Sequence, residues 1–399
     1  MDKKIAIIGG GAAGLFTAYL LSKHNLDITL FEKNNKLGKK LLATGNGRCN
    51  ITNESISNDN FYSNNLEFIS YTLKQFDYNI CKKIFNEIGI EFTKGEKNRV
   101  YPNSLNSSSV VELLKYQLEI NGVNIVLNYD VKTLESKDDK FIINETSSFD
   151  IVVISTGSIA MAKLGSCDSG YKLSSTFGHT TTPLFPSLVQ LVCDDSDISL
   201  ASGVKIEVKI GNIFGDLLFT KYGVSGSAIL DISRDISQDL LYKDKVNIKI
   251  DLLPQFSKEK LVSFLLKRAE QHPAKPLDLF FDGFINIKLA RFIISKVKLS
   301  HNIKKSGNLT RKDIQNIVYN LKNLNLNITS TKGFENCEVV AGGIDTYEID
   351  NKTMESKLKK DLYIIGEVVD IDGQCGGYNL HWAWASGYVA SKSILKGKL

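Results

Sequence analysis

The stretch Ile5-Ala6-Ile7-Ile8-Gly9-Gly10-Gly11-Ala12-Ala13-Gly14 decides the fold of the amino-terminal region. Its apolar run from Ile5 to Ile8 is what a buried parallel strand needs, and three glycines follow in the spacing G-x-G-x-x-G. Gly9 permits the tight turn, Gly11 lets a pyrophosphate approach the backbone, and Gly14 lets the helix pack close to the strand. The stretch therefore predicts a dinucleotide-binding unit, with Ala12 and Ala13 opening the helix.

A carboxylate stands where such a unit needs one. A second apolar strand, predicted over 28–31, ends at Glu32. A carboxylate there can accept hydrogen bonds from the ribose of an adenosine, and it would repel a 2′-phosphate. Strand, glycines, helix, strand and acid occur in order within about 30 residues, which is the context that the motif requires. The alternative, a glycine-rich turn in an ordinary α/β protein, is therefore less favoured.

A second glycine-rich segment lies near the other end of the chain. The predicted strand 362–365 is followed by Gly366 and Glu367, and the loop at Gly376 and Gly377 precedes a predicted helix from about Asn379 to Leu395. A helix N-terminus directed at the pyrimidine edge of a flavin would stabilise the negative charge of the reduced ring. NAD alone needs no such closing segment, so the two ends together predict FAD. The alternative is an amphipathic helix that only packs on the sheet.

Composition bounds the remaining possibilities. A chain of 399 residues with net charge +5 and 43% hydrophobic residues is long enough for two or three domains. The apolar stretch 5–21 follows two lysines, but it lacks a small-residue cleavage site and is short for a membrane span, so we expect a cytoplasmic protein without membrane association. The six cysteines and five histidines show no metal-ligand spacing, which predicts reduced thiols and no metal site.

The domain pattern changes twice along the chain. Residues 1–187 alternate strands and helices, 188–255 contain short strands, 256–335 are helical and basic, and 336–399 return to the first pattern. The predicted fold class is α/β: a two-dinucleotide-binding, Rossmann-like FAD domain interrupted by an inserted β-barrel-like plus helical domain. Residues 36–53 are too glycine-rich for a regular element and predict an ordered loop that touches the cofactor.

The inserted helical segment carries a local excess of positive charge. From Gln255 to Lys312 there are 13 Lys and Arg against 4 Asp and Glu. A solvated helical face is the favoured interpretation, and a surface for RNA or an acidic substrate is the alternative. An aromatic stacking platform would support RNA, but the spacing of the phenylalanines favours a core. Those phenylalanines are Phe256, Phe264, Phe280, Phe281, Phe284 and Phe292.

Five stretches together resemble the BaiN/YhiN-type flavoproteins, an NAD(P)/FAD-dependent oxidoreductase family also named for aminoacetone oxidase. They are the first glycine motif, 38–53 with Gly47-Arg48-Cys49-Asn50, 163–178, 218–233, and 341–387 with Gly376-Gly377-Tyr378-Asn379-Leu380. The resemblance implies an FAD-dependent oxidoreductase acting on a small organic molecule, with NAD(P)H left open as a transient electron donor. Thr156-Gly157-Ser158 and Lys221 depart from the family pattern, and Lys221 replaces a histidine, which weakens any inference about substrate.

The predicted cofactor contacts come from both ends of the chain. Gly9, Gly11 and Gly14 are assigned to the pyrophosphate, Glu32 to the ribose, and the Val131 backbone to the adenine. The other contacts are Ala12, Ala13, Lys33, Gly38, Lys39, Lys40, Arg48, Cys49, Asn50, Thr156, Gly157, Gly366, Glu367, Asp372, Gly377, Tyr378, Asn379 and Leu380. Lys39 and Arg48 could instead be solvated or pair with acids, and Tyr378 and Trp382 could be core aromatics.

No catalytic acid or base stands out. The candidates on the loops expected to face the flavin are Cys49, Tyr222 and His381. An FAD-containing RNA-binding or RNA-modifying protein is the alternative function, and a non-catalytic flavin-binding scaffold is a third. The substrate, the electron donor and the oligomeric state do not follow from the sequence.

Overall fold

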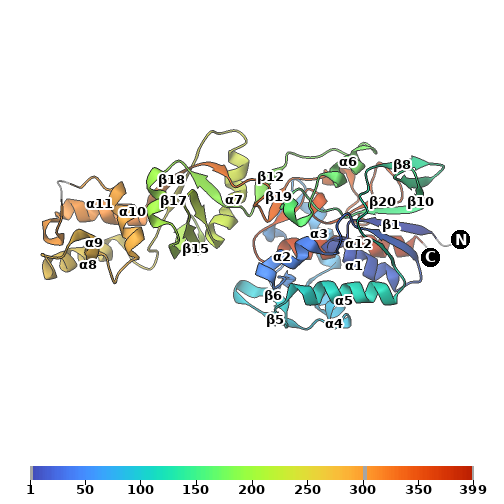
Figure 1. The fold of residues 1–399 in the computed structure, drawn as a ribbon, viewed down its shortest axis with the longest axis horizontal. Coiled ribbons are helices and arrows are strands. Elements are labelled where there is room, and N and C mark those ends of the chain that lie inside the picture. The colour runs from blue at the N-terminus through green and yellow to red at the C-terminus, as the bar shows by residue number, and fades with distance from the viewer. Residues whose placement is uncertain (1–2, 300–302, 398–399) are drawn as a thin grey trace. The chain divides into compact units, whose positions relative to one another are not determined.

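The computed structural model describes residues 3–299 and 303–397, and the chain divides into two compact units (Figure 1). The first unit consists of Met1–Phe185 and Cys337–Leu399, and the second of Pro186–Asn336. The second unit is thus an insertion into the first. Within the described residues, no helix combines the length and the apolar character that crossing a bilayer requires.

A parallel five-stranded sheet forms the centre of the first unit, in the order β20-β11-β1-β2-β7. Its strands are β1 (Lys4–Ile8), β2 (Asp27–Phe31), β7 (Asn124–Val126), β11 (Ile151–Ile154) and β20 (Leu362–Ile364). In the middle of the sheet, Ile5 pairs with Ile28 on one side and Ile151 on the other, and it is fully buried. Because all five strands run parallel, the loops that follow them emerge at one edge, where a ligand is expected.

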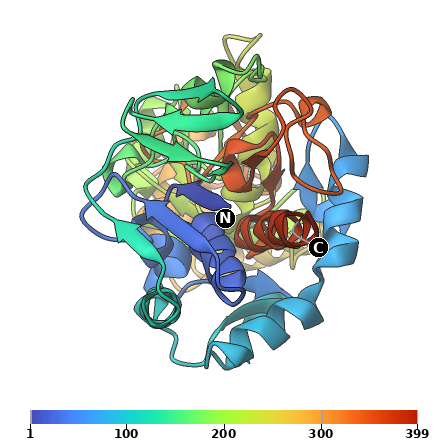
Figure 2. The ribbon, with the colours of Figure 1, turned by 90° about the vertical axis from the view of Figure 1, so that its right-hand side faces the viewer.

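Helices from both ends of the chain pack together beside this sheet. Helix α1 (Ala12–Ser22) lies against α12 (Tyr378–Lys396), as Figure 2 shows beside the blue strands. A Cβ on Gly387 would be 2.5 Å from Thr17 Oγ1, so the helices are closely packed. Phe16 contacts Trp384 with ring centroids 5.4 Å apart. The final helix is therefore part of the core that holds the first glycine turn.

Other elements complete the first unit. They are α3 (Leu66–Gln75), α4 (Tyr78–Glu87), α5 (Ser107–Ile120), α6 (Ser169–Ser175), β3 (Thr52–Asn53), β4 (Phe61–Tyr62), β5 (Phe92–Lys94), β6 (Arg99–Pro102), β8 (Leu134–Lys137), β9 (Lys140–Ile143), β10 (Ser147–Phe149), β19 (Val339–Ala341) and β21 (Asp372–Gly373). Strands β8 and β9 form a hairpin whose turn contains Asp138 and Asp139, both with positive φ. Val131 lies before β8, which starts at Leu134, and it is buried.

The glycine-rich segment 36–53 is more regular than predicted. Helix α2 spans Lys39–Gly47, with non-helical backbone at Thr44, Gly45 and Asn46. Its first turn forms because Leu41 is buried and the Leu42 carbonyl accepts a hydrogen bond from Ser107 Oγ of α5. Packing against α5 therefore overrides the local preference of the glycines for irregular structure.

The second unit combines a closed antiparallel sheet with a block of helices. The sheet order is β14-β15-β16-β13-β18-β17, and reciprocal backbone hydrogen bonds between Lys209 and Asp251 join its two ends. This barrel-like arrangement agrees with the predicted fold class. The strands are β13 (Leu191–Cys193), β14 (Lys205–Ile210), β15 (Ile213–Phe219), β16 (Gly223–Ser225), β17 (Val246–Ile250) and β18 (Leu324–Thr331), and α7 (Ser227–Asp239) packs on β15. Strand β12 (Phe185–Ser187) spans the boundary between the units.

The helical block lies between β17 and β18 in the chain. Its helices are α8 (Lys258–Gln271), α9 (Leu277–Phe280), α10 (Ile287–Lys296) and α11 (Arg311–Lys322). Residues 256–335 were predicted to be helical, but the chain returns to the sheet at Leu324. Leu324, Leu326 and Ile328 are buried while the residues between them are exposed, the period of two that a half-buried strand requires. Helices and sheet share one hydrophobic cluster.

Candidate flavin site

The turn between β1 and α1 contains two glycines that the protein needs for packing and one that leaves space. A Cβ on Gly9 would be 2.6 Å from the Ser155 carbonyl oxygen, and a Cβ on Gly14 would be 1.9 Å from the Gly9 carbonyl oxygen. A Cβ on Gly11 would meet no atom within 4 Å. Gly11 thus borders open space at a helix N-terminus whose first N–H groups have no intrahelical acceptor, which suits a pyrophosphate.

Glu32 is held rigidly at the end of β2. Its Oε2 accepts a hydrogen bond from Gly10 N at 2.9 Å, and its Oε1 accepts from Asn34 N and Nδ2 at 2.7 and 2.6 Å. A carboxylate has about four acceptor positions, so acceptor capacity is left for ribose hydroxyls. Glu32 is only 8% exposed, which limits competition from water. The geometry fits the predicted ribose contact.

The ends of β11 and β20 meet α2 at a polar cluster. Lys40 Nζ lies 2.7 Å from Glu367 Oε2, and both side chains are half-buried. Glu367 Oε1 is buried without a hydrogen-bond partner. Gly366 has φ 78° and Gly157 has φ 72°, and a Cβ on Gly157 would be 3.9 Å from Glu367 Oε2. The structure therefore brings Lys40, Gly157, Gly366 and Glu367 together, with an unsatisfied acceptor among them.

The N-terminus of α12 closes the same region. Gly377 has φ 97°, and a Cβ there would be 2.4 Å from the Thr52 carbonyl oxygen and 2.9 Å from Asn50 Oδ1. Asn50 Oδ1 is itself buried without a partner. Asn379 exchanges two 2.8 Å hydrogen bonds with the backbone of Gly373, so its side chain stabilises the loop. These orphaned atoms and tight glycines fit a bound flavin.

Four of the side chains singled out in the sequence lie against other parts of the protein. The Arg48 guanidinium lies over the Tyr101 ring at 4.8 Å, and Arg48 is exposed. Asp372 is fully buried in β21, which pairs with β4. Trp382 is buried and its Nε1 donates to the Gly366 carbonyl, so it is a core aromatic that holds the glycine turn. Tyr378 is also buried, in contact with Phe61.

The environments of Cys49 and His381 argue against both as catalytic groups. Burial raises the pKa of the Cys49 thiol to about 12 despite a hydrogen bond with Thr44. Burial lowers the pKa of His381 to about 4, and its two ring nitrogens lie 2.8 Å from Thr52 Oγ1 and 3.0 Å from the Phe76 carbonyl oxygen. Both residues are structural. Tyr222 belongs to the second unit, where its hydroxyl donates to Gln190 Oε1 at 2.6 Å.

Three residues that sequence reasoning missed belong to the same region. Arg99 Nε and the Tyr171 hydroxyl are buried without partners. Burial and the charge of Glu367 raise the pKa of Tyr171. Protein atoms around Glu338 raise the pKa of its carboxyl by desolvation, and the charges of Lys40 and Arg99 oppose the shift. Glu338 as a residue is exposed. No local motif marks these three residues, since distant segments bring them together.

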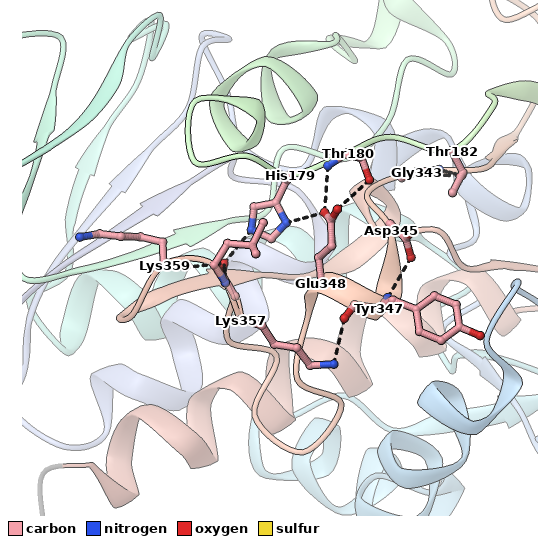
Figure 3. A network of polar contacts seen from close by, with 11 residues as sticks. His179, Thr180, Thr182, Gly343, Asp345, Tyr347, Glu348, Lys357 and Lys359 are labelled. Carbon is pink, nitrogen blue, oxygen red and sulfur yellow. Dashed lines mark hydrogen bonds and ion pairs between the residues drawn. The ribbon is translucent and has the colours of Figure 1, made fainter.

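A buried polar network lies elsewhere in the first unit (Figure 3). His179 Nδ1 is 3.1 Å from Glu348 Oε2, and its Nε2 is 2.7 Å from Ser356 Oγ. Thr180 donates to Glu348 through its backbone N–H and its hydroxyl at 2.8 and 2.7 Å. The Thr180 carbonyl accepts a hydrogen bond from Asp345 N. The network joins the segment that leaves the first unit to the segment that returns to it.

The serine–histidine–glutamate order of this network has the geometry of a nucleophilic triad, but its environment does not suit catalysis. Ser356 is 6% exposed, and its Oγ accepts hydrogen bonds from the backbone N–H groups of Leu358 and Lys359, both at 3.0 Å. An oxygen so enclosed has no access to substrate. The network is a structural brace. The described residues contain no group of three or more His, Cys, Asp or Glu arranged to hold a metal ion.

Comparison with known proteins agrees with this fold. A family model described as the HI0933-like protein Rossmann domain matches residues 3–393. The 3-dehydro-bile acid delta(4,6)-reductase of Clostridium scindens is 33% identical over 404 residues, with 98% of each chain covered. Two proteins named ribosomal RNA dihydrouridine synthase, from Haemophilus influenzae and Escherichia coli, are 30% and 28% identical, with 97% and 98% of each chain covered.

The parallel sheet, the glycine turn and the closing C-terminal segment define the class: an FAD-dependent oxidoreductase built on a Rossmann-like domain. The match over 391 residues, from 3 to 393, places the chain within that class. It belongs to the HI0933-like family.

Proposed function

We propose that this protein reduces a carbon–carbon double bond conjugated to a carbonyl group. The supporting observation is that the names of relatives with different substrates describe the same type of reaction. The name of the first relative describes reduction of a 3-oxo delta(4,6) diene, and the names of the other two describe reduction of uridine, whose C5=C6 bond is conjugated to a carbonyl. All three are aligned over nearly the full chain.

When bound, FAD supplies the hydride. Segments from both ends of the chain hold the FAD. Gly11 and the first turn of α1 bind the pyrophosphate, and Glu32 binds the ribose. The N-terminus of α12 orients the pyrimidine edge and stabilises negative charge there. Lys39 and Lys40 add positive charge, while the Val131 backbone contacts the adenine. The chain carries one G-x-G-x-x-G motif, so NAD(P)H is proposed to dock transiently as the electron donor.

Glu338 is proposed as the donor of the proton that accompanies the hydride. The residue is exposed, so a substrate can approach it, and the charges of Lys40 and Arg99 act on its carboxyl. Desolvation by the surrounding protein raises its pKa, so it holds a proton more readily than an ordinary glutamate. Cys49 and His381 are enclosed and cannot reach a substrate. A Glu338→Gln variant should slow substrate reduction at least tenfold, the lower end of the effect of a positioned acid, while the flavin spectrum and its reduction by NAD(P)H are retained.

The test follows the flavin absorbance of the holoprotein without oxygen. NADH and then NADPH are added, and the reduced protein is mixed with a 3-oxo-4,6-diene bile acid or with a ribosomal RNA transcript. Reoxidation by either substrate, with a saturated ketone or a dihydrouridine-containing RNA inert, supports the proposal. Reoxidation by neither substrate would overturn it, and a flavin that no donor reduces would indicate a non-catalytic flavin scaffold.

A further inference from the structure

The helical block of the second unit has an aromatic cluster outside its core. Phe280, Phe281 and Phe292 are buried as expected, but Phe256 and Phe264 are 36% and 41% exposed. Phe284 is half-buried and contacts both: the ring centroids are 6.0 Å apart for Phe256 and 4.8 Å for Phe264. We call Phe256, Phe264 and Phe284 the aromatic surface. The prediction that all six phenylalanines form the core is wrong for two of them.

This exposure is not explained by the packing of α8. Leu261, Leu265 and Ala269 are buried at spacing i, i+4 and i+8, which already gives the helix its core face. Phe264 lies beside that face and leaves its ring partly in water. Exposed contiguous aromatic groups are uncommon in the absence of a binding partner. The aromatic surface is therefore a candidate interaction site.

The loops that carry the other two rings are held by cations. Lys322 Nζ donates to the carbonyls of Leu253 and Phe256 at 2.9 and 2.7 Å. Arg268 donates to the carbonyls of Phe280 and Asp282, both at 2.6 Å, next to Phe284. Fixing the rings before a ligand arrives reduces the entropy cost of binding.

Positive charge surrounds the exposed ring on α8. Lys260 and Lys267 lie four residues before and three after Phe264, so they share its helix face. Both are exposed, and Arg268 is bound to carbonyls. Ten basic residues of the block are exposed, and none forms an ion pair with another described residue: Lys258, Lys260, Lys267, Lys288, Arg291, Lys298, Lys304, Lys305, Arg311 and Lys312.

The nearby acids do not cancel this charge. Glu259, Glu270, Asp278 and Asp282 are the acids between Gln255 and Lys312, against 13 basic residues. Glu270 lies six residues after Phe264, on the other side of α8. Phe264 is thus flanked by Lys260 and Lys267 on its own face of α8.

We propose that the aromatic surface binds unpaired bases of an RNA, with Lys260 and Lys267 contacting its phosphates. Aromatic rings stack with any base, and neighbouring cations follow the backbone, the combination that single-stranded nucleic acid requires. An acidic membrane would use the charge but not three mutually tilted rings on one rigid surface. This proposal rests on the proposed function, because it names RNA as the class of substrate. The observations describe a binding surface, so RNA binding is measured in the absence of flavin turnover.

The test measures binding of the full-length holoprotein to labelled single-stranded oligouridine by fluorescence anisotropy. Phe264→Leu keeps an apolar contact with Phe284 but removes the aromatic face, so the affinity should fall about tenfold. Phe264→Tyr keeps the face and should retain the affinity. Phe214→Ala is the matched control, because Phe214 is an exposed phenylalanine of the same unit outside the helical block, and it should not affect binding.

A second variant tests the charges. Lys260→Gln with Lys267→Gln should lower the steepness of log affinity against log salt concentration by about 1.4, because each phosphate contact on a single strand contributes about 0.7. Lys243→Gln with Lys249→Gln makes the same charge change outside the block and should leave the slope unchanged. Thermal unfolding and flavin content confirm that each variant folds.

Several results would overturn the inference. One is equal loss of affinity in Phe264→Leu and Phe214→Ala. Another is equal affinity for duplex and single-stranded RNA. A third is retained RNA binding in Phe264→Leu together with lost sedimentation on phosphatidylserine vesicles, which would assign the surface to membranes. If RNA binds as described but no substrate reoxidises the flavin, the proposed reaction fails while the surface stands.

Discussion

The two units differ in where their charged and aromatic groups face. In the first unit, Glu32 and the Lys40–Glu367 pair are buried or half-buried around glycine turns, and the aromatic rings near α12 are enclosed. In the second, ten cations of the helical block are exposed and form no ion pair with the residues that the structure describes, and two rings of a three-ring cluster are exposed. Polar groups that hold a resident cofactor must be preorganised inside, whereas groups that meet a large partner must remain accessible.

The largest effect should come from two glycines of one turn. Gly14→Ala places a Cβ 1.9 Å from the Gly9 carbonyl oxygen, so we expect a loss of about 3 kcal/mol or more in the free energy of unfolding, together with loss of FAD. Gly11→Ala meets no protein atom. The apoprotein should unfold within about 1 kcal/mol of the wild type, while FAD affinity falls at least about tenfold.

Urea unfolding of the apoproteins and flavin titration measure both changes. Equal destabilisation by the two substitutions would show that Gly11 is also a packing glycine, and the open space beside it would then have no bearing on the cofactor.

The next largest effect distinguishes the two units by the ligand that each is proposed to bind. Glu32→Gln removes the charge that strengthens hydrogen bonds from ribose hydroxyls, so FAD affinity should fall by about 1.5 to 3 kcal/mol while oligouridine binding is retained. Phe264→Leu should do the reverse. Flavin titration and anisotropy on the same preparations test this contrast. The contrast fails if either substitution lowers the affinity for both FAD and oligouridine.

A smaller effect concerns acid stability and His179. Burial lowers the pKa of His179, against the opposing hydrogen bond to Glu348. Burial acts to raise the pKa of Glu348, but hydrogen bonds from Thr180 and His179 lower it overall. In both cases the unfolded chain binds the proton more readily, so stability present at neutral pH is lost as the pH falls.

The histidine contribution should be lost below about pH 6.5 and the glutamate contribution below about pH 4.5, with a slope of at most about 1.4 kcal/mol per pH unit for each proton. His179→Gln should flatten the upper part of the profile. Urea unfolding between neutral and acidic pH checks this. An unchanged dependence of the free energy of unfolding on pH would show that His179 does not cause the loss of stability in acid.

The smallest effect is a lack of reaction at Cys49. Its buried thiol, with a pKa of about 12, should resist iodoacetamide near neutral pH, whereas the half-buried Cys167 and Cys375 should react. Mass spectrometry of the native and the urea-unfolded protein distinguishes them. Rapid native labelling of Cys49 would restore it as a catalytic candidate.

The local motifs were sufficient to predict the strands, the glycine turn and the helix at the start of the first unit. The spacing of Gly9, Gly11 and Gly14 and the placement of Glu32 predict their structure, because each acts within one strand–turn–helix–strand unit. The change of pattern near residue 188 predicts an insertion with strands followed by helices. In contrast, α2 and the return of the chain into β18 were missed, since contacts with α5 and with β13 and β17 decide them.

By itself, the sequence determined the dinucleotide fold, the place of Glu32 at the end of the second strand and the excess of positive charge in the insert. Only the tertiary structure decided which groups are reachable: it enclosed Cys49 and His381, brought Arg99, Tyr171 and Glu338 to the cofactor region, and left Phe264 at the surface. The physical reason is that a motif specifies backbone geometry over a few residues, whereas burial and hydrogen-bond partners depend on segments far apart in the chain.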